Sequence, residues 1–236
     1  MSAAPRQLRV LSGGAAQGAV AALAAQFKTQ TGCELAGTFG AVGAMKNKLL
    51  AGEPTDFVIL TKALIAELAA AGHLLPETCA DLGRVRTGVA VKHGDPIPDL
   101  SSASALRAAL LAATEIYFPD PLRATAGIHF AKVLDSLGLR EALAPRLRPH
   151  PNGATAMREM SRAAGSGLLG CTQITEIKST PGVTLVGPLP AEFELATVYS
   201  AAVCAAAASA DLARRFVALL TGESTRALRA QAGFEF

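Results

Sequence analysis

Tryptophan is absent from this 236-residue chain, and aromatic residues make up only 5% of it. Stacking platforms of the kind that bind single-stranded nucleic acid are therefore not expected. Charged residues are also scarce, at 17%, and the 22 basic ones are scattered rather than gathered into a stripe. We therefore expect no nucleic-acid partner. A net charge of +3 is compatible with a small anionic ligand.

Cysteine motifs are missing as well. Cys33, Cys79, Cys171 and Cys204 stand far apart, with no CxxC pair and no cluster with histidine. No zinc spacing exists, so we expect no metal and no cofactor. Unpaired thiols in a reducing compartment are the favoured interpretation, although long-range disulfides stay open.

Long apolar runs are lacking too. No stretch of about 18 apolar residues is free of glycine or polar breaks, so no membrane span is expected. The Ala-rich stretch VLSGGAAQGAVAALAAQF (residues 10–27) fits a strand, a glycine turn and a helix better than a leader peptide. We expect a cytoplasmic protein, or a periplasmic one if a leader was removed before Met1. An ABC permease is expected as a partner only if the protein is exported.

Alternating strand and helix patterns fill the chain. LRVLS, CELAGTF and DFVILT have the pattern of buried strands, and each is followed by a helical stretch that ends at a glycine: Gly32, Gly52 and Gly72. Such repeats indicate a parallel sheet covered by helices on both faces.

A second α/β unit is predicted in the middle of the chain. RTGVAVK, TEIYF, GLLGCTQI and GVTLVG have strand patterns, and helical stretches separate most of them. We expect a discontinuous lobe 1 of residues 1–84 plus 190–236, and an inserted lobe 2 of residues 85–189. The predicted architecture is two α/β lobes with a ligand cleft between them.

Candidate ligand-binding residues follow the ends of these strands, where helices begin. A helix N-terminus offers unpaired N–H groups and a partial positive charge, so it favours the binding of an anion. The stretch FPDPLRATAGIHF (residues 118–130) is the most specific of these junctions, because an arginine able to make bidentate contacts precedes a helix start. The predicted ligand-binding residues are Ser12, Gly13, Gly14, Ala15, Ala41, Val42, Gly43, Thr61, Arg123, Thr125, Ala126, Gly127, Thr172, Gln173 and Thr175.

Each candidate also has a purely structural interpretation. Ser12 and its glycines suit a tight turn, Thr125 suits a helix cap, and Arg123 suits a surface salt bridge. Gln173 and Thr175 suit hydrogen bonds within a turn. These alternatives stay open at this point.

Familiar catalytic motifs are missing: there is no GxSxG, no HExxH, no P-loop and no GxGxxG after a strand. If the protein is an enzyme, we therefore expect its reaction to be a proton transfer by general acid–base catalysis. The candidate catalytic residues are His129, one turn into a predicted helix, and Lys62. A lysine at a helix start is unfavourable with the helix dipole, which slightly favours a functional role. A packed or solvated histidine is the alternative for His129.

The order of LRVLSGGAAQGAVAALAAQF, GAVGAMKNKLLAGEPTDFVILT, DPLRATAGIHFAKVLDSLGL, GLLGCTQITEI and VGPLP resembles the molybdate-type periplasmic binding proteins over nearly the whole chain. That resemblance implies the type II periplasmic-binding-protein fold. Molybdate binders typically have serines where this chain has Ala15 and Val42, and a tyrosine where it has Gln173. Each missing hydroxyl removes a hydrogen bond worth about 1–3 kcal/mol to a buried oxyanion.

The chain contains the segments TAGIHFAKVL, TQITEI and VGPLPAE. In these segments it resembles a divergent branch of these binding proteins that includes aconitate isomerase, a cofactor-free enzyme of this fold. The resemblance implies a cofactor-independent isomerase of a small di- or tricarboxylate. The alternative is a non-catalytic substrate-binding protein of a molybdate-type ABC transport system, or a sensor of a small oxyanion or carboxylate.

Overall fold

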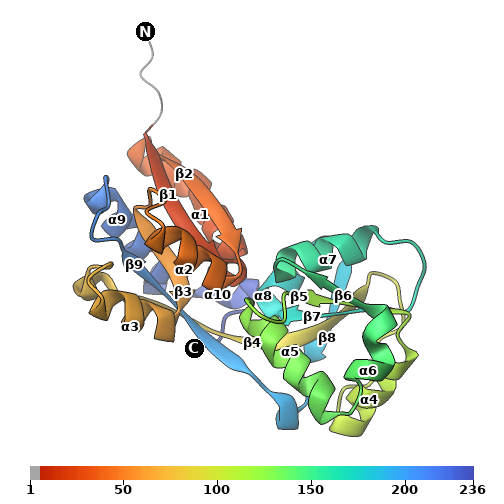
Figure 1. Ribbon diagram of the computed structural model, residues 1–236. Coiled ribbons are helices and arrows are strands. Elements are labelled where there is room, and N and C mark those ends of the chain that lie inside the picture. The colour runs from red at the N-terminus through yellow and green to blue at the C-terminus, as the bar shows by residue number, and fades with distance from the viewer. Residues whose placement is uncertain (1–5) are drawn as a thin grey trace. The chain divides into compact units, whose positions relative to one another are not determined.

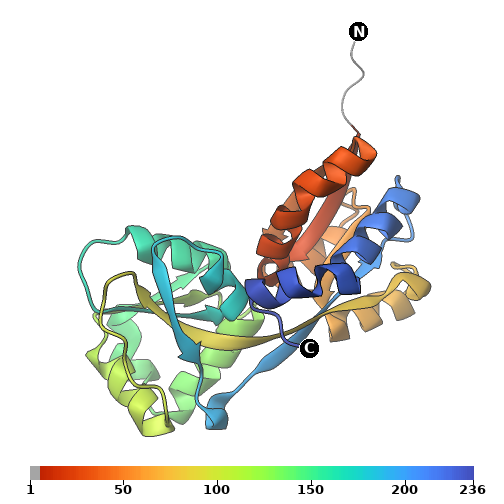
Figure 2. The ribbon, with the colours of Figure 1, turned by 180° about the vertical axis from the view of Figure 1, so that it is seen from behind.

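The computed structural model describes residues 6–236 and divides them into two compact units (Figures 1 and 2). Unit 1 contains the described residues up to Arg84 together with Val198–Phe236, and unit 2 is the continuous segment Val85–Thr197. The chain passes from one unit to the other within two strands, β4 (Ala80–Lys92) and β9 (Ala196–Val203).

Unit 1 is built on the strand order β2-β1-β3-β9. The first three strands pair in parallel, whereas β9 is antiparallel to β3. The strands of this unit are β1 (Gln7–Gly13), β2 (Glu34–Gly40) and β3 (Phe57–Thr61), and its helices are α1 (Gln17–Thr31), α2 (Val42–Leu50), α3 (Lys62–Ala70), α9 (Ala210–Thr221) and α10 (Arg226–Ala232), with short 3-10 turns at Gly14–Ala16, Pro76–Thr78 and Glu223–Thr225.

Aromatic rings from distant segments join in the core of unit 1. Phe27 of α1 meets Phe216 of α9 edge to face, with ring centroids 5.0 Å apart, and Phe57 of β3 lies 5.3 Å from the same ring. All three side chains are fully buried. Burial of this much apolar surface explains why the C-terminal segment belongs to the unit that the N-terminal strands begin.

Unit 2 is also a mixed sheet. Strand β5 pairs in parallel with β6 and β7, while β4 is antiparallel to β7 and β8. The further strands are β5 (Glu115–Pro119), β6 (Leu147–His150), β7 (Leu168–Gln173) and β8 (Val183–Pro188), and the helices are α4 (Ala103–Ala112), α5 (Thr125–Ser136), α6 (Arg140–Leu143), α7 (Gly153–Arg162) and α8 (Ile174–Lys178), with 3-10 turns at Ala144–Arg146 and Ala191–Phe193.

Two hydrophobic clusters cover the two faces of this sheet. Ile116 and Phe118 of β5 pack with α4 and α5, and Tyr117 between them packs with Met157 and Met160 of α7. Alternate residues of a strand point to opposite faces, so the pattern IYF places its apolar side chains on both. The sheet therefore has helices on both faces, as the sequence predicts.

Two details differ from the sequence prediction. Neither sheet is purely parallel, because β9 in unit 1 and β4 and β8 in unit 2 run against their neighbours. The second boundary also lies at Thr197–Val198 instead of residues 189–190. The segment after Leu189 stays with unit 2 because Phe193 packs on its core and the carbonyl of Leu195 accepts the N–H of Thr87.

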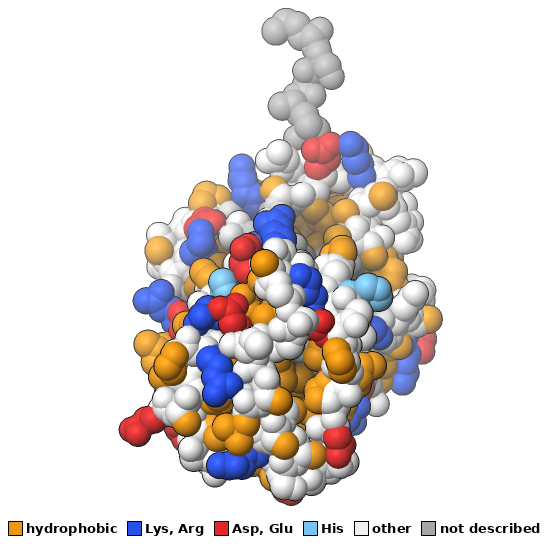
Figure 3. All heavy atoms as spheres, turned by 90° about the vertical axis from the view of Figure 1, so that its right-hand side faces the viewer, with side chains coloured by type: hydrophobic (Ala, Val, Ile, Leu, Met, Phe, Trp, Pro, Cys, Tyr) orange, Lys and Arg blue, Asp and Glu red, His pale blue; other side chains and the backbone are white. Residues whose placement is uncertain are grey.

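Within residues 6–236 no helix combines the length and the apolar character needed to cross a membrane. On the face drawn in Figure 3, lysine and arginine side chains are interspersed with aspartate and glutamate.

Candidate functional site

The carboxyl ends of three strands meet at one edge of unit 2. Strands β5, β6 and β7 run in the same direction, and Pro119 at the end of β5 is paired with His150 at the end of β6. Helices α5, α7 and α8 follow β5, β6 and β7 as the next helices along the chain. Their N-termini therefore gather at a single edge, where an α/β sheet offers its ligand site.

Helix α5 begins one residue away from the predicted cap. Ala124 is the N-cap and no side chain caps the helix, so the expectation that Thr125 is the cap was wrong. The preceding turn explains the shift, since the N–H of Leu122 donates to the Asp120 carboxylate and that of Ala124 to the Asp120 carbonyl. Thr125 thus becomes the first helical residue.

The arginine at the start of α5 has no partner among the described residues. Arg123 is exposed, and among residues 6–236 it makes no hydrogen bond or ion pair, so the surface salt bridge considered for it does not form. By helix geometry the N–H groups of Thr125, Ala126 and Gly127 have no carbonyl partner within the helix. The turn thus presents backbone donors beside an unpaired guanidinium.

Gly127 is required where α5 approaches β5. A Cβ atom on this residue would lie 2.3 Å from the carbonyl oxygens of both Pro119 and Asp120. Backbone atoms cannot move aside cheaply, so only glycine lets the helix start this close to the strand end. The glycine in the sequence TAGIHF is therefore explained by this packing.

His129 lies on the second turn of α5 and is half-buried. Its Nε2 lies 2.8 Å from the carbonyl oxygen of Phe193. A carbonyl oxygen only accepts hydrogen bonds, so Nε2 carries the proton in the neutral ring and Nδ1 has the free lone pair. The imidazole is therefore held in one tautomer, with Nδ1 as its unprotonated nitrogen.

Unpaired polar side chains stand at the end of β7. Gln173 is 3% exposed and Thr175 is 4% exposed, and neither the amide of Gln173 nor the hydroxyl of Thr175 has a hydrogen-bond partner among the described residues. The alternative of hydrogen bonds within a turn is therefore wrong for these side chains. Thr87, which the sequence analysis did not single out, is the cross-strand neighbour of Gln173, is 1% exposed and is likewise unpaired.

The Thr172 side chain, by contrast, has a hydrogen-bond partner within unit 2. Its hydroxyl donates to the Glu176 carboxylate at 2.6 Å, and the N–H groups of Gln173 and Ala154 donate to the same carboxylate. Burial raises the pKa of Glu176, while the three donors oppose that effect. Gly153 makes room for this arrangement, since a Cβ there would lie 1.9 Å from the Thr172 hydroxyl.

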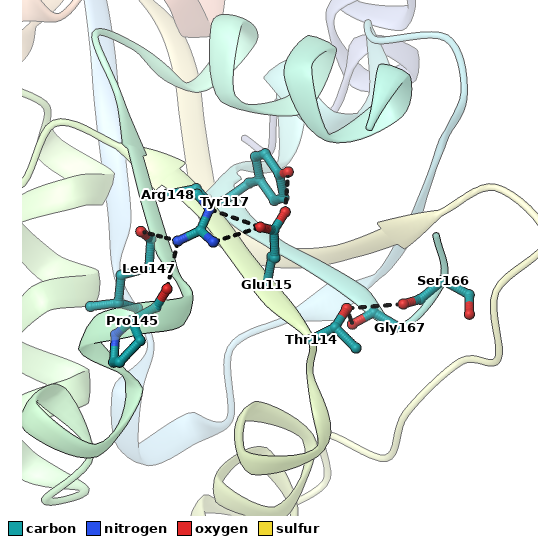
Figure 4. A network of polar contacts seen from close by, with 8 residues as sticks. All are labelled: Thr114, Glu115, Tyr117, Pro145, Leu147, Arg148, Ser166 and Gly167. Atoms are coloured by element: carbon teal, nitrogen blue, oxygen red, sulfur yellow. Dashed lines mark hydrogen bonds and ion pairs between the residues drawn. The ribbon is translucent and has the colours of Figure 1, made fainter. Parts of the chain in front are cut away.

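At the opposite, amino-terminal edge of the same sheet, the polar side chains have hydrogen-bond partners (Figure 4). The Tyr117 hydroxyl donates to Glu115 at 2.5 Å, Arg148 reaches the other oxygen of that carboxylate, and the Thr114 hydroxyl donates to the Ser166 carbonyl. The unpaired groups around Gln173 thus reflect a local property of the carboxyl-terminal edge.

In unit 1 the predicted residues also collect at the carboxyl edge of parallel strands. Ser12 is fully buried and its hydroxyl donates to the carbonyl of Gly13 at 2.9 Å, ahead of the turn through Gly14 and Ala15. Two further helices begin at this edge. Ala41 is the N-cap of α2 with Val42 and Gly43 following it, and Thr61 is the N-cap of α3, accepting from the N–H of Leu64 at 3.4 Å.

Lys62 has a structural partner. Its Nζ lies 2.7 Å from Asp81, whose other carboxylate oxygen accepts a hydrogen bond from Ser200 at 2.6 Å. The Asp81 carboxylate offsets the unfavourable position of a cation at a helix start. With 65% of its side chain exposed, Lys62 is a solvated ion-pair member.

No group of three or more His, Cys, Asp or Glu residues within the described part of the chain is placed to hold a metal ion. The four cysteines are free, with Cys79 exposed and the others buried.

The α/β architecture of the two units is the type II periplasmic-binding-protein fold. The chain belongs to the family described as bacterial extracellular solute-binding protein, whose model matches residues 8–235.

Individual relatives narrow the comparison. The chain is 28% identical over 225 residues to an aconitate isomerase from Pseudomonas sp., covering 92% of this chain and 82% of the relative. Its fold is similar to that of the periplasmic molybdate-binding protein of Azotobacter vinelandii, with a TM-score of 0.78 and 21% identity over 97% of this chain and 99% of the other. The sulfate-binding protein SubI of Mycobacterium tuberculosis H37Rv gives a TM-score of 0.71 and 18% identity, over 97% and 86% of the two chains. The resemblance predicted from the sequence is thus confirmed.

Proposed function

We propose that this protein is a cofactor-independent isomerase of a small di- or tricarboxylate such as aconitate. The observation that carries the proposal is the similarity to an aconitate isomerase over 92% of the chain. The geometry of unit 2 supports it, because a helix start with unpaired N–H groups and a tautomer-fixed histidine lie on the same helix, α5.

A substrate carboxylate is proposed to bind at the start of α5. It would accept hydrogen bonds from the N–H groups of Thr125–Gly127 and pair with the guanidinium of Arg123. The positive end of the helix dipole favours an anion there, and the guanidinium geometry suits a bidentate contact with a carboxylate. At the edge of unit 1, the turn Ser12–Ala15 and the start of α2 are proposed as further anion-binding segments.

The proton shift is assigned to His129. Its Nδ1 would remove a proton from a methylene carbon next to a carbon–carbon double bond that is conjugated with a carboxylate. The electron pair moves along the allylic system, and the proton returns at the former alkene carbon, so atoms and charge balance. The N–H groups of a helix start stabilise the enolate-like charge that develops between these steps. Lys62, already paired with Asp81, is the weaker candidate.

Exchange in deuterated water tests the proposal. The protein is first screened by thermal shift against cis- and trans-aconitate, citrate, molybdate and sulfate, and each stabilising ligand is followed by proton NMR. We expect a tricarboxylate to stabilise the protein and to isomerise with deuterium incorporation. Stabilisation with neither isomerisation nor exchange would reject the isomerase.

Two pairs of variants assign the roles. Arg123→Ala should weaken carboxylate binding about 10- to 100-fold while the protein stays folded; Arg107→Ala, another exposed arginine of unit 2, is its control. His129→Gln should abolish exchange and keep binding, with the exposed His73→Gln as its control. Unchanged exchange in His129→Gln would remove the base from the mechanism.

The second candidate function is a non-catalytic solute-binding protein, and membership of the solute-binding family favours it. Its partner would be an ABC permease and its location the periplasm. For the isomerase we propose the cytoplasm, since four free thiols suit a reducing compartment. Fractionation of a native host, with detection of this chain in each fraction, separates the two.

A further inference from the structure

Three buried polar side chains at and near the end of β7 in unit 2 break the rule that buried polar groups are hydrogen-bonded. Thr87 on β4, Gln173 at the end of β7 and Thr175 in α8 are 1%, 3% and 4% exposed. Both polar atoms of the Gln173 amide and both threonine hydroxyls have no partner among the described residues. Thr87 and Gln173 lie directly opposite each other in the β4–β7 ladder, and Thr175 follows two residues later.

Their immediate surroundings show that the local backbone is well satisfied. The N–H of Thr87 donates to the carbonyl of Leu195 and its carbonyl accepts from the N–H of Leu189. The N–H of Gln173 donates to Glu176, in the manner of a capping box. The Gln173 side chain takes no part in capping α8. It is the side-chain polar atoms of these three residues that lack hydrogen-bond partners among residues 6–236. This indicates a binding site for a group from outside the chain.

The chemistry of the leftover atoms restricts that partner. The Gln173 amide has two N–H donors on Nε2 and an acceptor oxygen, Oε1. Oε1 forms a hydrogen bond only if the ligand donates one. Fully ionised sulfate or molybdate supplies acceptors alone, so it would leave Gln173 Oε1 buried and unpaired. A carboxylic acid or an alcohol both donates and accepts, and a carboxylic acid matches the amide with two parallel hydrogen bonds.

We propose that Thr87, Gln173 and Thr175 form a subsite for a protonated oxygen group of the ligand, a carboxylic acid or a hydroxyl. The proposal rests on the proposed function only for the ligand class, a small carboxylate. The subsite selects hydrogen-bond-donating carboxylates against ionised inorganic oxyanions, because a site built to pair with a donor rejects a ligand that lacks one. A carboxylic acid bound here is taken up together with its proton.

Isothermal titration calorimetry provides the test, with tricarballylate, citrate and sulfate as probes. Tricarballylate has three carboxyl groups and no hydroxyl, whereas citrate also has a hydroxyl. Titrations in buffers of different ionisation enthalpy measure the protons taken up on binding. We expect tricarballylate to bind with proton uptake and more tightly at about pH 5 than at about pH 8, whereas citrate binding without uptake would assign the subsite to the hydroxyl. A preference for sulfate over both carboxylates would overturn the subsite.

Gln173→Met is the decisive variant. We expect it to lose about 10- to 100-fold in affinity for tricarballylate or citrate and to lose the proton uptake. Gln26→Met, at an exposed glutamine of α1, is the matched control. Unchanged affinity in Gln173→Met would mean that only water fills the place, and the proposal would be wrong.

Other titratable groups near the subsite need a control of their own. Glu176 lies one turn along α8, Arg86 next to Thr87 is 3.8 Å from Glu194, and His129 contacts the same 191–195 segment. If the protons are taken up by Glu176, then Glu176→Gln removes the uptake while Gln173→Met keeps it, and the subsite is overturned.

Thr87→Val and Thr175→Val add a readout that a structural role would not give. Valine keeps the shape and removes an unpaired buried hydroxyl, so the free protein should melt at a higher temperature while its carboxylate affinity falls. A lower melting temperature with unchanged affinity would show structural hydroxyls. Proton-linked binding with neither isomerisation nor deuterium exchange would reject the isomerase and leave the subsite standing.

Discussion

Gly127 shows how one missing side chain positions a helix start. Its backbone lies so close to the end of β5 that a Cβ would meet two carbonyl oxygens at 2.3 Å. We expect Gly127→Ala to lower the free energy of unfolding by about 1–3 kcal/mol, since overpacking against backbone forces a shift. Gly187→Ala is the matched control, because nothing lies within 4 Å of its added Cβ. Urea denaturation measures both, and equal small losses would show that α5 can move away.

His150 links the stability of unit 2 to pH. Its ring stacks on Tyr117 with centroids 5.7 Å apart, its Nε2 is buried without a partner, and burial lowers its pKa. With the folded-state pKa below the unfolded value of about 6.5, the unfolded chain binds more protons in that window. Stability is therefore fully present above about pH 6.5 and is lost as pH falls through the lowered pKa.

The variant His150→Phe keeps a ring against Tyr117 and removes the titration. We expect the free energy of unfolding to depend less on pH below about 6.5 in this variant than in the parent protein. Each unit of separation between the two pKa values corresponds to about 1.4 kcal/mol. The exposed His73→Phe should leave the pH dependence unchanged. A parallel pH dependence for parent and His150→Phe would contradict the assignment.

Single residues of the site differ in how far the sequence predicts them. Gln173 and Thr175 follow an apolar strand and are recognisable as strand-end polar residues. Thr87 was missed because RTGVAVK has an ordinary strand pattern, and the partner across the sheet that makes it part of the site is a non-local feature. Glu176 was missed for the same reason, since its donors come from two separate stretches of chain, Thr172–Gln173 and Ala154.

Helix ends are the most predictable elements. The glycines expected to stop α1, α2 and α3 all adopt positive φ, from 69° at Gly32 to 82° at Gly52, because a left-handed residue after a helix favours glycine. Strand β6 was missed: it has four residues and includes Pro149, which works against a strand pattern. The start of β4 was also missed, because Gly83 interrupts its apolar run.

Glu176 joins three elements, since its carboxylate is bound by Thr172 of β7, the N–H of Gln173 that caps α8, and the N–H of Ala154 in the first turn of α7. We expect Glu176→Ala to lower the free energy of unfolding by about 1–3 kcal/mol or more, because buried donors lose their acceptor. Ser102→Ala, which removes the N-cap of α4, should cost only about 1 kcal/mol. Thermal and urea unfolding of both variants check this.

The pH dependence of that loss has a definite sign. Burial raises the folded-state pKa of Glu176, so its stabilising contribution is full below the unfolded value of about 4.3 and declines as pH rises through the raised pKa. The difference between the parent protein and Glu176→Ala should therefore shrink from acid to neutral pH. A difference that grows with pH would show that the carboxylate is stabilised in its ionised form.

The architecture of both units follows from local patterns, whereas strand direction and the second boundary do not. Alternating apolar stretches and stop glycines predict the βα order, and unit 2 is inserted as expected. The sequence does not reveal that β9 and β4 run antiparallel to their neighbours, because pairing direction depends on where the chain returns. The predicted boundary at residues 189–190 lies too early, because the contacts of Phe193 and Leu195 keep the following segment in unit 2.

Two fragments of the chain test that boundary. Unit 2 is continuous and has its own two hydrophobic clusters, so residues 85–197 should fold cooperatively alone. A fragment ending at residue 189 lacks the Phe193 packing and the hydrogen bonds of His129 and Thr87 to the 191–195 segment. We expect it to be about 2–4 kcal/mol less stable in urea. Phe193→Ala in the full chain, which keeps the backbone bonds, should lose a smaller part of this. Equal stability of the two fragments would place the boundary at residues 189–190, as the sequence predicts.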